Sequence, residues 1–345
     1  MERHGDLSQL QIADVPQPGV IEPTDVLIHV RAAALNHLDL WTLRGLPGLS
    51  LQFPHVLGAD GAGTVVEVGD GVARAAVGDR VLINPGLSCY RCENCRAGEQ
   101  SQCERFALLG EHRSGTFAEY VVVPEHNVLP VPTMPESLPA LSWSEAAAFP
   151  LVTLTAWRML VTRARVQRGE RVFIWGVGGG VSSAALAVAK LQGAFVIVTS
   201  SSERKLELAR DLGADVTLNH ADQDVVREVQ QLTEGRGVDV VVENVGEATW
   251  DRSLRLLARG GRLVTCGATT GAKVQVDVRR LFWHQWTILG STMGSAGEFR
   301  EIVRLLGQGH LRPVMDATYP LDRAVDAFQR LERGEQLGKI AVEMP

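Results

Sequence analysis

The feature that most constrains the fold is a series of short apolar segments alternating with helical segments between Arg171 and Cys266. The apolar segments are rich in β-branched residues and nearly uninterrupted, which is typical of strands buried on both faces. The predicted strands are Arg171–Trp175, Phe195–Thr199, Val216–Asn219, Val238–Glu243 and Arg262–Cys266, and the predicted helices are Gly180–Leu191, Glu203–Leu212 and Asp222–Thr233. This alternation predicts an α/β fold with a doubly wound parallel sheet.

The chain before this region is predicted to be rich in β-strands. Asp25–Ala32 alternates apolar and polar residues, as a half-buried strand does. Further short strands are expected at Gly61–Val68, Arg80–Ile83 and Thr116–Val123. Glu145–Val161 is long and apolar, and we predict one or two helices there.

The tail from Ile288 is assigned back to the first, β-rich domain. It combines a strand, a helix at Glu298–Gly307 and a final strand at Lys339–Glu343. The predicted domains are therefore residues 1–151 together with 288–345, and residues 152–287.

Composition supports two folded domains and excludes several classes of protein. The chain has 345 residues, of which 45% are hydrophobic and 21% charged, so it can bury a large core. Its net charge of -6 supplies no basic field for nucleic acid. Met1–Leu10 lacks an apolar signal-peptide core, and no stretch approaches the ~18 apolar residues of a membrane span. We expect a cytoplasmic protein.

A glycine-rich turn, Trp175–Ser182 (WGVGGGVS), joins an apolar strand to an alanine-rich helix. Glycine lets such a turn close and lets its backbone approach a pyrophosphate, while the helix start offers free N–H groups. The turn predicts a dinucleotide site formed by Gly176, Gly178, Gly179, Gly180 and Val181.

The end of the second strand indicates which dinucleotide is preferred. An NAD site normally has an acidic residue there, which binds the ribose 2′-OH. Here the strand runs into three serines, Ser200–Ser202, followed by Glu203, Arg204 and Lys205. Hydroxyl and cationic groups suit a 2′-phosphate, so we predict NADP(H) over NAD(H), bound by Ser200, Arg204 and Lys205, with Glu203 directed away.

Four of the five cysteines lie within fifteen residues: Cys89, Cys92, Cys95 and Cys103. Four thiolates at this spacing suit tetrahedral zinc with no open coordination position, which is a structural site. An iron–sulfur cluster also uses four cysteines, but nothing nearby indicates electron transfer. We predict one structural zinc per subunit, in a lobe at about residues 86–110, and a core role for Cys266.

Taken together, these landmarks resemble the medium-chain dehydrogenase/reductase superfamily over nearly the whole chain. Besides the cysteine spacing and the glycine turn, similar segments are Gly115–Tyr120, Leu212–Asp215, Gly260–Arg262 and Gly338–Lys339. The resemblance implies a GroES-like domain in two segments around a Rossmann domain, with the active site between them. Relatives usually carry an extra strand before the segment at His4, which only Met1–Arg3 precede here.

This chain has other residues at the three positions where the family's alcohol dehydrogenases carry their catalytic zinc ligands. Where the family's alcohol dehydrogenases carry a Cys, the His of a Gly-His-Glu motif and a second Cys, this chain has Asn36, Ala59 and Leu151. Neither Asn nor Leu is a zinc ligand of ordinary strength. Leu35–Asp39 with Arg44 is similar to the quinone oxidoreductase and enoyl reductase branch, which works without catalytic metal.

That branch transfers a hydride from NADPH to an alkene conjugated with a carbonyl, so a donor must stabilise the carbonyl oxygen. Asn36 is the candidate donor, and Thr155 matches a threonine that packs on the nicotinamide. The predicted catalytic residues are Asn36, His37, Asp39, Asp60 and Thr155, and the resemblance adds Asn244, Gly267, Gly290 and Lys339 to the cofactor site. The segment after Arg44 lacks the tyrosine acid of many enoyl reductases, which leaves His37, His55, Asp60 or water as proton donor, and quinones equally open as substrates.

Two other functions remain open. One is a zinc alcohol dehydrogenase with substitute ligands drawn from His37, Asp39, His55 and Asp60. The other is a non-enzymatic NADPH-binding relative.

Trp286–Ser291 resembles the strand that pairs across a two-fold axis in this superfamily, so a homodimer or homotetramer is expected.

Overall fold

The computed structural model describes residues 1–20 and 22–345 and confirms the mixed α/β fold. The chain divides into two compact units, Met1–Val152 with Gly294–Pro345, and Thr153–Met293. We call them unit 1 and unit 2. No helix in the described residues is both long enough and apolar enough to cross a membrane.

Unit 1 is built on a seven-stranded sheet with the order β14-β15-β1-β2-β3-β7, in which β6 also pairs with β1. The strands of this sheet are β1 (Asp25–Ala34), β2 (Asp60–Val68), β3 (Arg80–Ile83), β6 (Tyr120–Pro124), β7 (Val128–Pro130), β14 (Met315–Pro320) and β15 (Lys339–Glu343), while β4 (Gly86–Leu87) and β5 (Ala107–Leu108) form a separate two-stranded sheet. The helices of unit 1 are η1 (Leu7–Gln9), α1 (His37–Arg44), α2 (Glu93–Arg96), η2 (Gln100–Gln102), η3 (Glu125–Asn127), α3 (Trp143–Ala148), α10 (Ala296–Gly307), η5 (Leu321–Arg323) and α11 (Ala324–Glu332).

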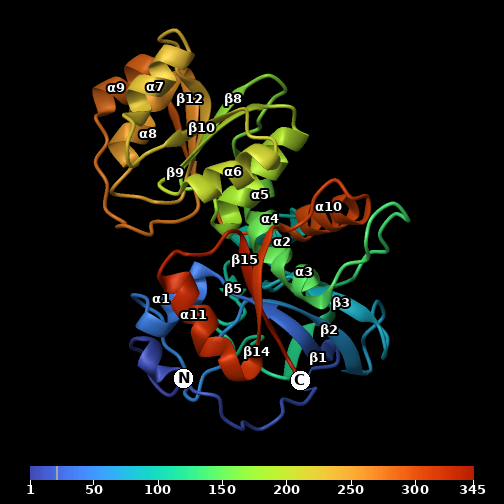
Figure 1. The fold of residues 1–345 in the computed structure, drawn as a ribbon. Coiled ribbons are helices and arrows are strands. Elements are labelled where there is room, and N and C mark those ends of the chain that lie inside the picture. The colour runs from blue at the N-terminus through green and yellow to red at the C-terminus, as the bar shows by residue number, and fades with distance from the viewer. Residues whose placement is uncertain (21) are drawn as a thin grey trace. The chain divides into compact units, whose positions relative to one another are not determined.

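The two ends of the chain meet in this sheet. In Figure 1 the red strand β15 lies near the blue strand β1, and the two pair antiparallel with Ala34 opposite Ala341. Fully buried apolar side chains such as Val26, Val30 and Ile83 form the core beneath the sheet. Burial of this apolar surface stabilises the pairing of segments from opposite ends of the sequence.

Unit 2 is a six-stranded parallel sheet with the order β10-β9-β8-β11-β12-β13. Its strands are β8 (Arg171–Ile174), β9 (Phe195–Ser200), β10 (Val216–Asn219), β11 (Val238–Glu243), β12 (Leu257–Thr265) and β13 (Thr287–Gly290). Its helices are η4 (Arg158–Arg163), α5 (Gly180–Leu191), α6 (Glu203–Asp211), α7 (Val225–Leu232), α8 (Trp250–Leu256) and α9 (Val278–His284), while α4 (Pro150–Trp157) spans the boundary between the units. The predicted doubly wound sheet is therefore confirmed.

Several expected boundaries differ from the structure, among them those of β12, which begins at Leu257, and α7, which spans Val225–Leu232. The chain returns to unit 1 at Gly294 rather than at residue 288, because β13 pairs with β12 and so belongs to the parallel sheet. The strand expected at Thr116–Val123 begins only at Tyr120, because the N–H groups of residues 115–117 bond instead to the carbonyls of residues 56–58. The segment Glu145–Val161, where one or two helices were expected, contains parts of two α-helices, the second of which begins at Pro150.

Candidate active site

The end of β1 and the beginnings of β2 and β15, which are far apart in the sequence, lie side by side in unit 1. Strand β1 lies between β2 and β15, and Ala34 near its end pairs with Asp60 of β2. Because both neighbours run antiparallel to β1, their first residues, Asp60 and Lys339, lie beside the last residues of β1. Asn36, the N-cap of α1, follows immediately. The fold thus brings Asn36, Asp60 and Lys339 together.

These three side chains form a buried hydrogen-bonded network, in which Asn36 is 7%, Lys339 3% and Asp60 0% exposed. The Lys339 ammonium donates to Asp60 Oδ2 at 2.9 Å and to Asn36 Oδ1 at 2.7 Å. Asn36 Nδ2 donates to Asp60 Oδ2 at 3.0 Å, and the Leu151 N–H donates to Asp60 Oδ1 at 2.9 Å. A buried charge is tolerated only when paired and hydrogen-bonded, and this pair meets that condition.

Asp39 lies directly beside the network and is 1% exposed. Its carboxylate accepts the N–H of Asn36 at 2.7 Å and the N–H of Gly58 at 3.1 Å. Gly58 has a φ of +105°, in the left-handed region that favours glycine, so this turn can present its N–H to the carboxylate. Burial raises the pKa of Asp39 to about 7, and the Asp60 charge adds to the rise, against the opposing effects of the two N–H groups and the Lys339 ammonium.

This pKa predicts a specific pH dependence of stability. The pKa of Asp39 rises from 3.8 to about 7 on folding, so the folded state holds the proton more tightly. Its contribution to stability is therefore fully present below about pH 4 and is lost as pH rises through about 7. In Asp39→Asn this contribution is absent, so the free energy of unfolding, measured in urea between those pH values, should fall less steeply than in the parent. One group changes the slope by at most about 1.4 kcal/mol per pH unit, and parallel curves for the two proteins would contradict the prediction.

The two histidines near this network differ in environment. His37 is exposed at the start of α1. His55 is buried, and its Nε2 lies 3.0 Å from the carbonyl oxygen of Gly110. Within residues 1–20 and 22–345, the cysteine cluster is the one group of three or more side chains placed to share a metal ion. The structure therefore does not assemble His37, Asp39, His55 and Asp60 into a substitute zinc site.

Thr155, the remaining predicted catalytic residue, lies in unit 2. It is 5% exposed, and its Oγ1 donates to the sulfur of Met293 at 3.7 Å. Its role at the nicotinamide stays a prediction.

The predicted cofactor residues of unit 2 follow the carboxyl ends of its parallel strands. In such a sheet these ends share one edge, and ligands bind where the strand order reverses. In unit 2 the order reverses between β8 and β11. Residues at or just after these strand ends include the turn after β8, Ser200 of β9, Asn244 after β11, Gly267 after β12 and Gly290 of β13. The structure thus brings these residues to a single edge.

The glycine-rich turn is tied to the end of β9. The N–H of Val177 donates to the carbonyl of Thr199 at 2.7 Å, and the N–H of Gly176 donates to the Thr199 hydroxyl at 3.3 Å. A Cβ on Gly178 would lie 2.6 Å from Cδ of Lys205, so the lysine stem passes directly over the turn. The first N–H groups of α5 have no acceptor within the helix, which suits a phosphate.

The acidic and basic residues at the start of α6 have different surroundings. Glu203 forms an ion pair with Arg210 at 2.7 Å, and its side chain is 57% exposed. Arg204 is exposed beside it. The acidic residue is thus engaged by its own helix, while Lys205 lies over the glycine turn.

Sequence reasoning missed one buried carboxylate, Glu243, at the end of β11. It is 0% exposed and accepts the N–H groups of Val245 and Gly246 at 2.7 and 3.0 Å, and the Ser253 hydroxyl. The neighbouring Asn244 Oδ1 is buried without a hydrogen-bond partner among the described residues. Glu243 therefore holds a loop that carries a buried acceptor at this edge of the parallel sheet. A charged residue at the end of a buried valine run was the available signal.

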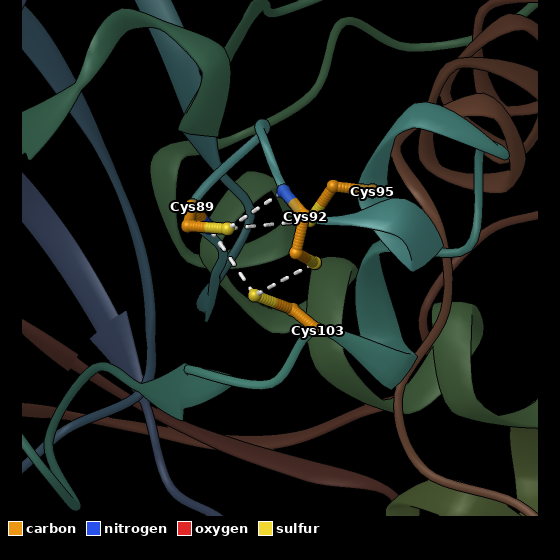
Figure 2. A group of neighbouring side chains, drawn as sticks. All are labelled: Cys89, Cys92, Cys95 and Cys103. Carbon is orange, nitrogen blue, oxygen red and sulfur yellow. Dashed lines mark hydrogen bonds between the residues drawn. The ribbon is translucent and has the colours of Figure 1, made fainter.

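The four predicted zinc ligands converge in unit 1, as Figure 2 shows. The Sγ atoms of Cys89 and Cys95 lie 4.0 Å apart, and so do those of Cys92 and Cys103. Tetrahedral zinc with bonds of about 2.3 Å separates its sulfurs by roughly 3.8 Å, so the cluster fits the ion. These four cysteines would hold it with no open position.

The thiols of the cluster differ in acidity. N–H groups of Arg91 and Cys92 point at Cys89 and lower the pKa of its thiol to about 6. Burial raises the pKa of Cys95 to about 12. A thiol must lose its proton to bind zinc, so a bound cation would favour the thiolate of Cys95 against the effect of burial.

Comparison with known proteins agrees with this geometry. Residues 22–133 match the alcohol dehydrogenase GroES-like domain, and residues 180–308 match the zinc-binding dehydrogenase family. An NAD-dependent alcohol dehydrogenase of Sulfolobus acidocaldarius is 33% identical over 98% of this chain and 97% of its own length.

Solved structures extend the likeness over the whole chain. The crystal structure of an NAD-dependent alcohol dehydrogenase is 44% identical, with a TM-score of 0.93 over 100% of this chain and 98% of that one. A 2-octenoyl-CoA carboxylase reductase, solved with NADP and 2-octenoyl-CoA, is 31% identical, with a TM-score of 0.89 over 98% of this chain and 83% of that one. The chain therefore belongs to the medium-chain dehydrogenase/reductase superfamily and is an oxidoreductase that uses a nicotinamide cofactor.

Proposed function

We propose that this protein is an NADPH-dependent reductase of α,β-unsaturated carbonyls or quinones, and that it works without catalytic zinc. One observation carries the proposal: the buried Lys339 ammonium donates hydrogen bonds to both the Asn36 amide oxygen and the Asp60 carboxylate. A positive charge is thus built into the chain beside Asn36, one of the three positions where the family's zinc alcohol dehydrogenases carry a metal ligand. One structural zinc in the cysteine cluster completes the proposed complement of metals.

The chain's own residues have three tasks in this reaction. The bound dinucleotide supplies the hydride, and the edge of unit 2 holds it. Asn36 donates a hydrogen bond to the substrate oxygen as negative charge develops there. His55 and Asp60 are engaged by Gly110 and Lys339, so the proton for the substrate carbon comes from water or from the exposed His37.

The relatives support two reactions. The 2-octenoyl-CoA carboxylase reductase was solved with NADP and an unsaturated thioester, which favours reduction of conjugated carbonyls. The two NAD-dependent alcohol dehydrogenases favour alcohol oxidation as the second candidate. Alcohol oxidation with catalytic zinc would require ligands that Asn36, Ala59 and Leu151 do not supply.

A spectrophotometric screen separates the two reactions. We expect loss of NADPH absorbance with enones, unsaturated thioesters or quinones, unaffected by a chelator applied too briefly to strip the cysteine cluster. Primary alcohols should be poor substrates, because Asn36, Ala59 and Leu151 would not lower the pKa of an alcohol as a zinc ion would. Chelator-sensitive alcohol oxidation without enone or quinone reduction would overturn the proposal, and tight cofactor binding without any turnover would indicate a non-enzymatic role.

The preference for NADPH has its own test. Arg204→Ala and Lys205→Ala each remove a cation near the proposed 2′-phosphate, and a charge-assisted bond is worth about 1.5–3 kcal/mol, or about 10- to 150-fold in Kd. Each variant should raise the Kd of NADPH by that factor and leave the Kd of NADH nearly unchanged. Ser200→Asp should also weaken NADPH binding, because its carboxylate repels the 2′-phosphate. Arg210→Ala is the matched control on the same helix, since Arg210 pairs with Glu203. Tighter binding of NADH than of NADPH by the parent protein would refute the preference.

We also propose that two copies associate through β13. This strand ends the sheet, with β12 as its neighbour in the described chain. On the adjacent helix α9, Phe282 and Trp283 are 64% and 66% exposed. An apolar edge of this kind needs cover, and a symmetric copy supplies it.

Light scattering at micromolar concentration should show a dimer, or a tetramer built from dimers. Replacing Phe282 and Trp283 together with serine should shift the protein toward monomer, because the buried apolar area is lost. Val77→Ser, which changes a residue that is 64% exposed in unit 1, should not alter the mass. A monomeric parent protein would rule out the association.

A further inference from the structure

The ammonium of Lys339 has a complete and fixed set of acceptors. It donates to Leu35 O at 2.8 Å, Asn36 Oδ1 at 2.7 Å and Asp60 Oδ2 at 2.9 Å. An ammonium has three N–H donors, so each one is used. The side chain is 4% exposed, so solvent does not compete for these bonds.

This arrangement fixes the orientation of the Asn36 carboxamide. A flipped amide would place Nδ2 against the Lys339 donor, so Oδ1 must face Lys339 and Nδ2 must face Asp60. One Nδ2 hydrogen is bound by Asp60 at 3.0 Å. The other reaches Ala34 O at 3.3 Å, which is longer than the usual range of about 2.7–3.2 Å.

The weakly held hydrogen is therefore the one that Asn36 can offer to another acceptor. A cation on the amide oxygen withdraws electron density and strengthens the N–H groups as donors, because linked hydrogen bonds polarise one another. Asp60 prevents the amide from turning away as the weak contact is exchanged.

We propose that Lys339 is a positioning residue, which orients and polarises the Asn36 amide for hydrogen bonding to the substrate oxygen. This rests on the proposed function. In the step, a hydride adds to the β-carbon, the alkene pair forms the new double bond to the carbonyl carbon, and the carbonyl pair moves to the oxygen that Asn36 faces. The substrate is reduced and the dinucleotide oxidised. Lys339 and Asn36 keep their protons, and the α-carbon takes its proton from water or from His37.

The test is a double-mutant cycle on kcat with Lys339→Met, Asn36→Ala and the combined variant. Removing one donor at a developing oxyanion typically lowers kcat about 100- to 1000-fold, so Asn36→Ala should fall in that range and Lys339→Met by at least about tenfold. Because Lys339 acts through Asn36, Lys339→Met should add little in the Asn36→Ala background. Arg330→Met, which breaks a partly exposed ion pair with Asp316 in the same unit, should leave kcat unchanged.

A second variant separates positioning from mere folding. Lys339→Met alone leaves Asp60 buried without its partner, whereas Lys339→Met with Asp60→Asn removes both charges. The double variant should recover the denaturation midpoint of the parent protein but not its kcat. Denaturation of the four proteins of the cycle should also show non-additive shifts in midpoint, a readout that needs no turnover.

Two results would overturn the inference. One is additive effects of Lys339→Met and Asn36→Ala on both kcat and the midpoint. The other is a weakened NADPH Kd with unchanged kcat in Lys339→Met, which would make Lys339 a cofactor ligand, as the family resemblance implies. The cycle is run on whichever hydride transfer the parent performs, so failure of the enone proposal is seen separately in the substrate screen.

Discussion

Asp60→Ala should lower the free energy of unfolding by about 3–5 kcal/mol, because it leaves a buried ammonium without its counter-charge. Asp60 is 0% exposed and accepts from Lys339, Asn36 and the Leu151 N–H, so one substitution leaves three donors unsatisfied. Urea denaturation at neutral pH measures the loss.

The matched control for Asp60→Ala is Glu332→Ala. Glu332 pairs with Arg44 at 2.6 Å, but the two side chains are 37% and 51% exposed. An exposed pair of this kind contributes at most about 1 kcal/mol. Losses of equal size in the two variants would show that the Asp60 network does not behave as a buried ion pair.

Cys92→Ser should abolish zinc binding and unfold the lobe around the cluster. Even the loss of a partner outside the ligand set costs about 10–100-fold in metal affinity, so the loss of a direct ligand should cost more. Because structural zinc binding is coupled to local folding, amides near Cys89–Cys103 should lose their protection from hydrogen exchange. The zinc content should fall from one per subunit toward zero.

Cys266→Ala is the control for this variant, since Cys266 lies in unit 2 and outside the cluster. It should retain one zinc per subunit. Retention of full zinc and full amide protection by Cys92→Ser would contradict a four-cysteine structural site.

The sequence allowed prediction of the elements whose signals are local. The strand Val238–Glu243 and the helix Gly180–Leu191 were predicted with the bounds that the structure has, since periodicity and flanking turns define them. The cysteine cluster was equally accessible, because its ligands lie close together along the chain.

The network at Asn36 could not be predicted in the same way. Lys339 lies 303 residues from Asn36 and 279 from Asp60, and they meet only because β15 pairs with β1 beside β2. Sheet register at this distance is set by tertiary packing and leaves no short-range pattern. The burial of Asp39 could not be predicted either, because it also depends on how α1 packs in the folded unit.

Elemental analysis of the active protein tests most directly the central claim that hydride transfer needs no catalytic zinc. Protein purified from zinc-rich medium, and shown to reduce a conjugated enone or a quinone with NADPH, should contain one zinc per subunit. Its turnover should survive brief chelation, because Lys339 supplies the only cation that the Asn36 network requires. Two zinc ions per subunit, with turnover lost when the second is removed, would contradict the account and point to metal-assisted hydride transfer.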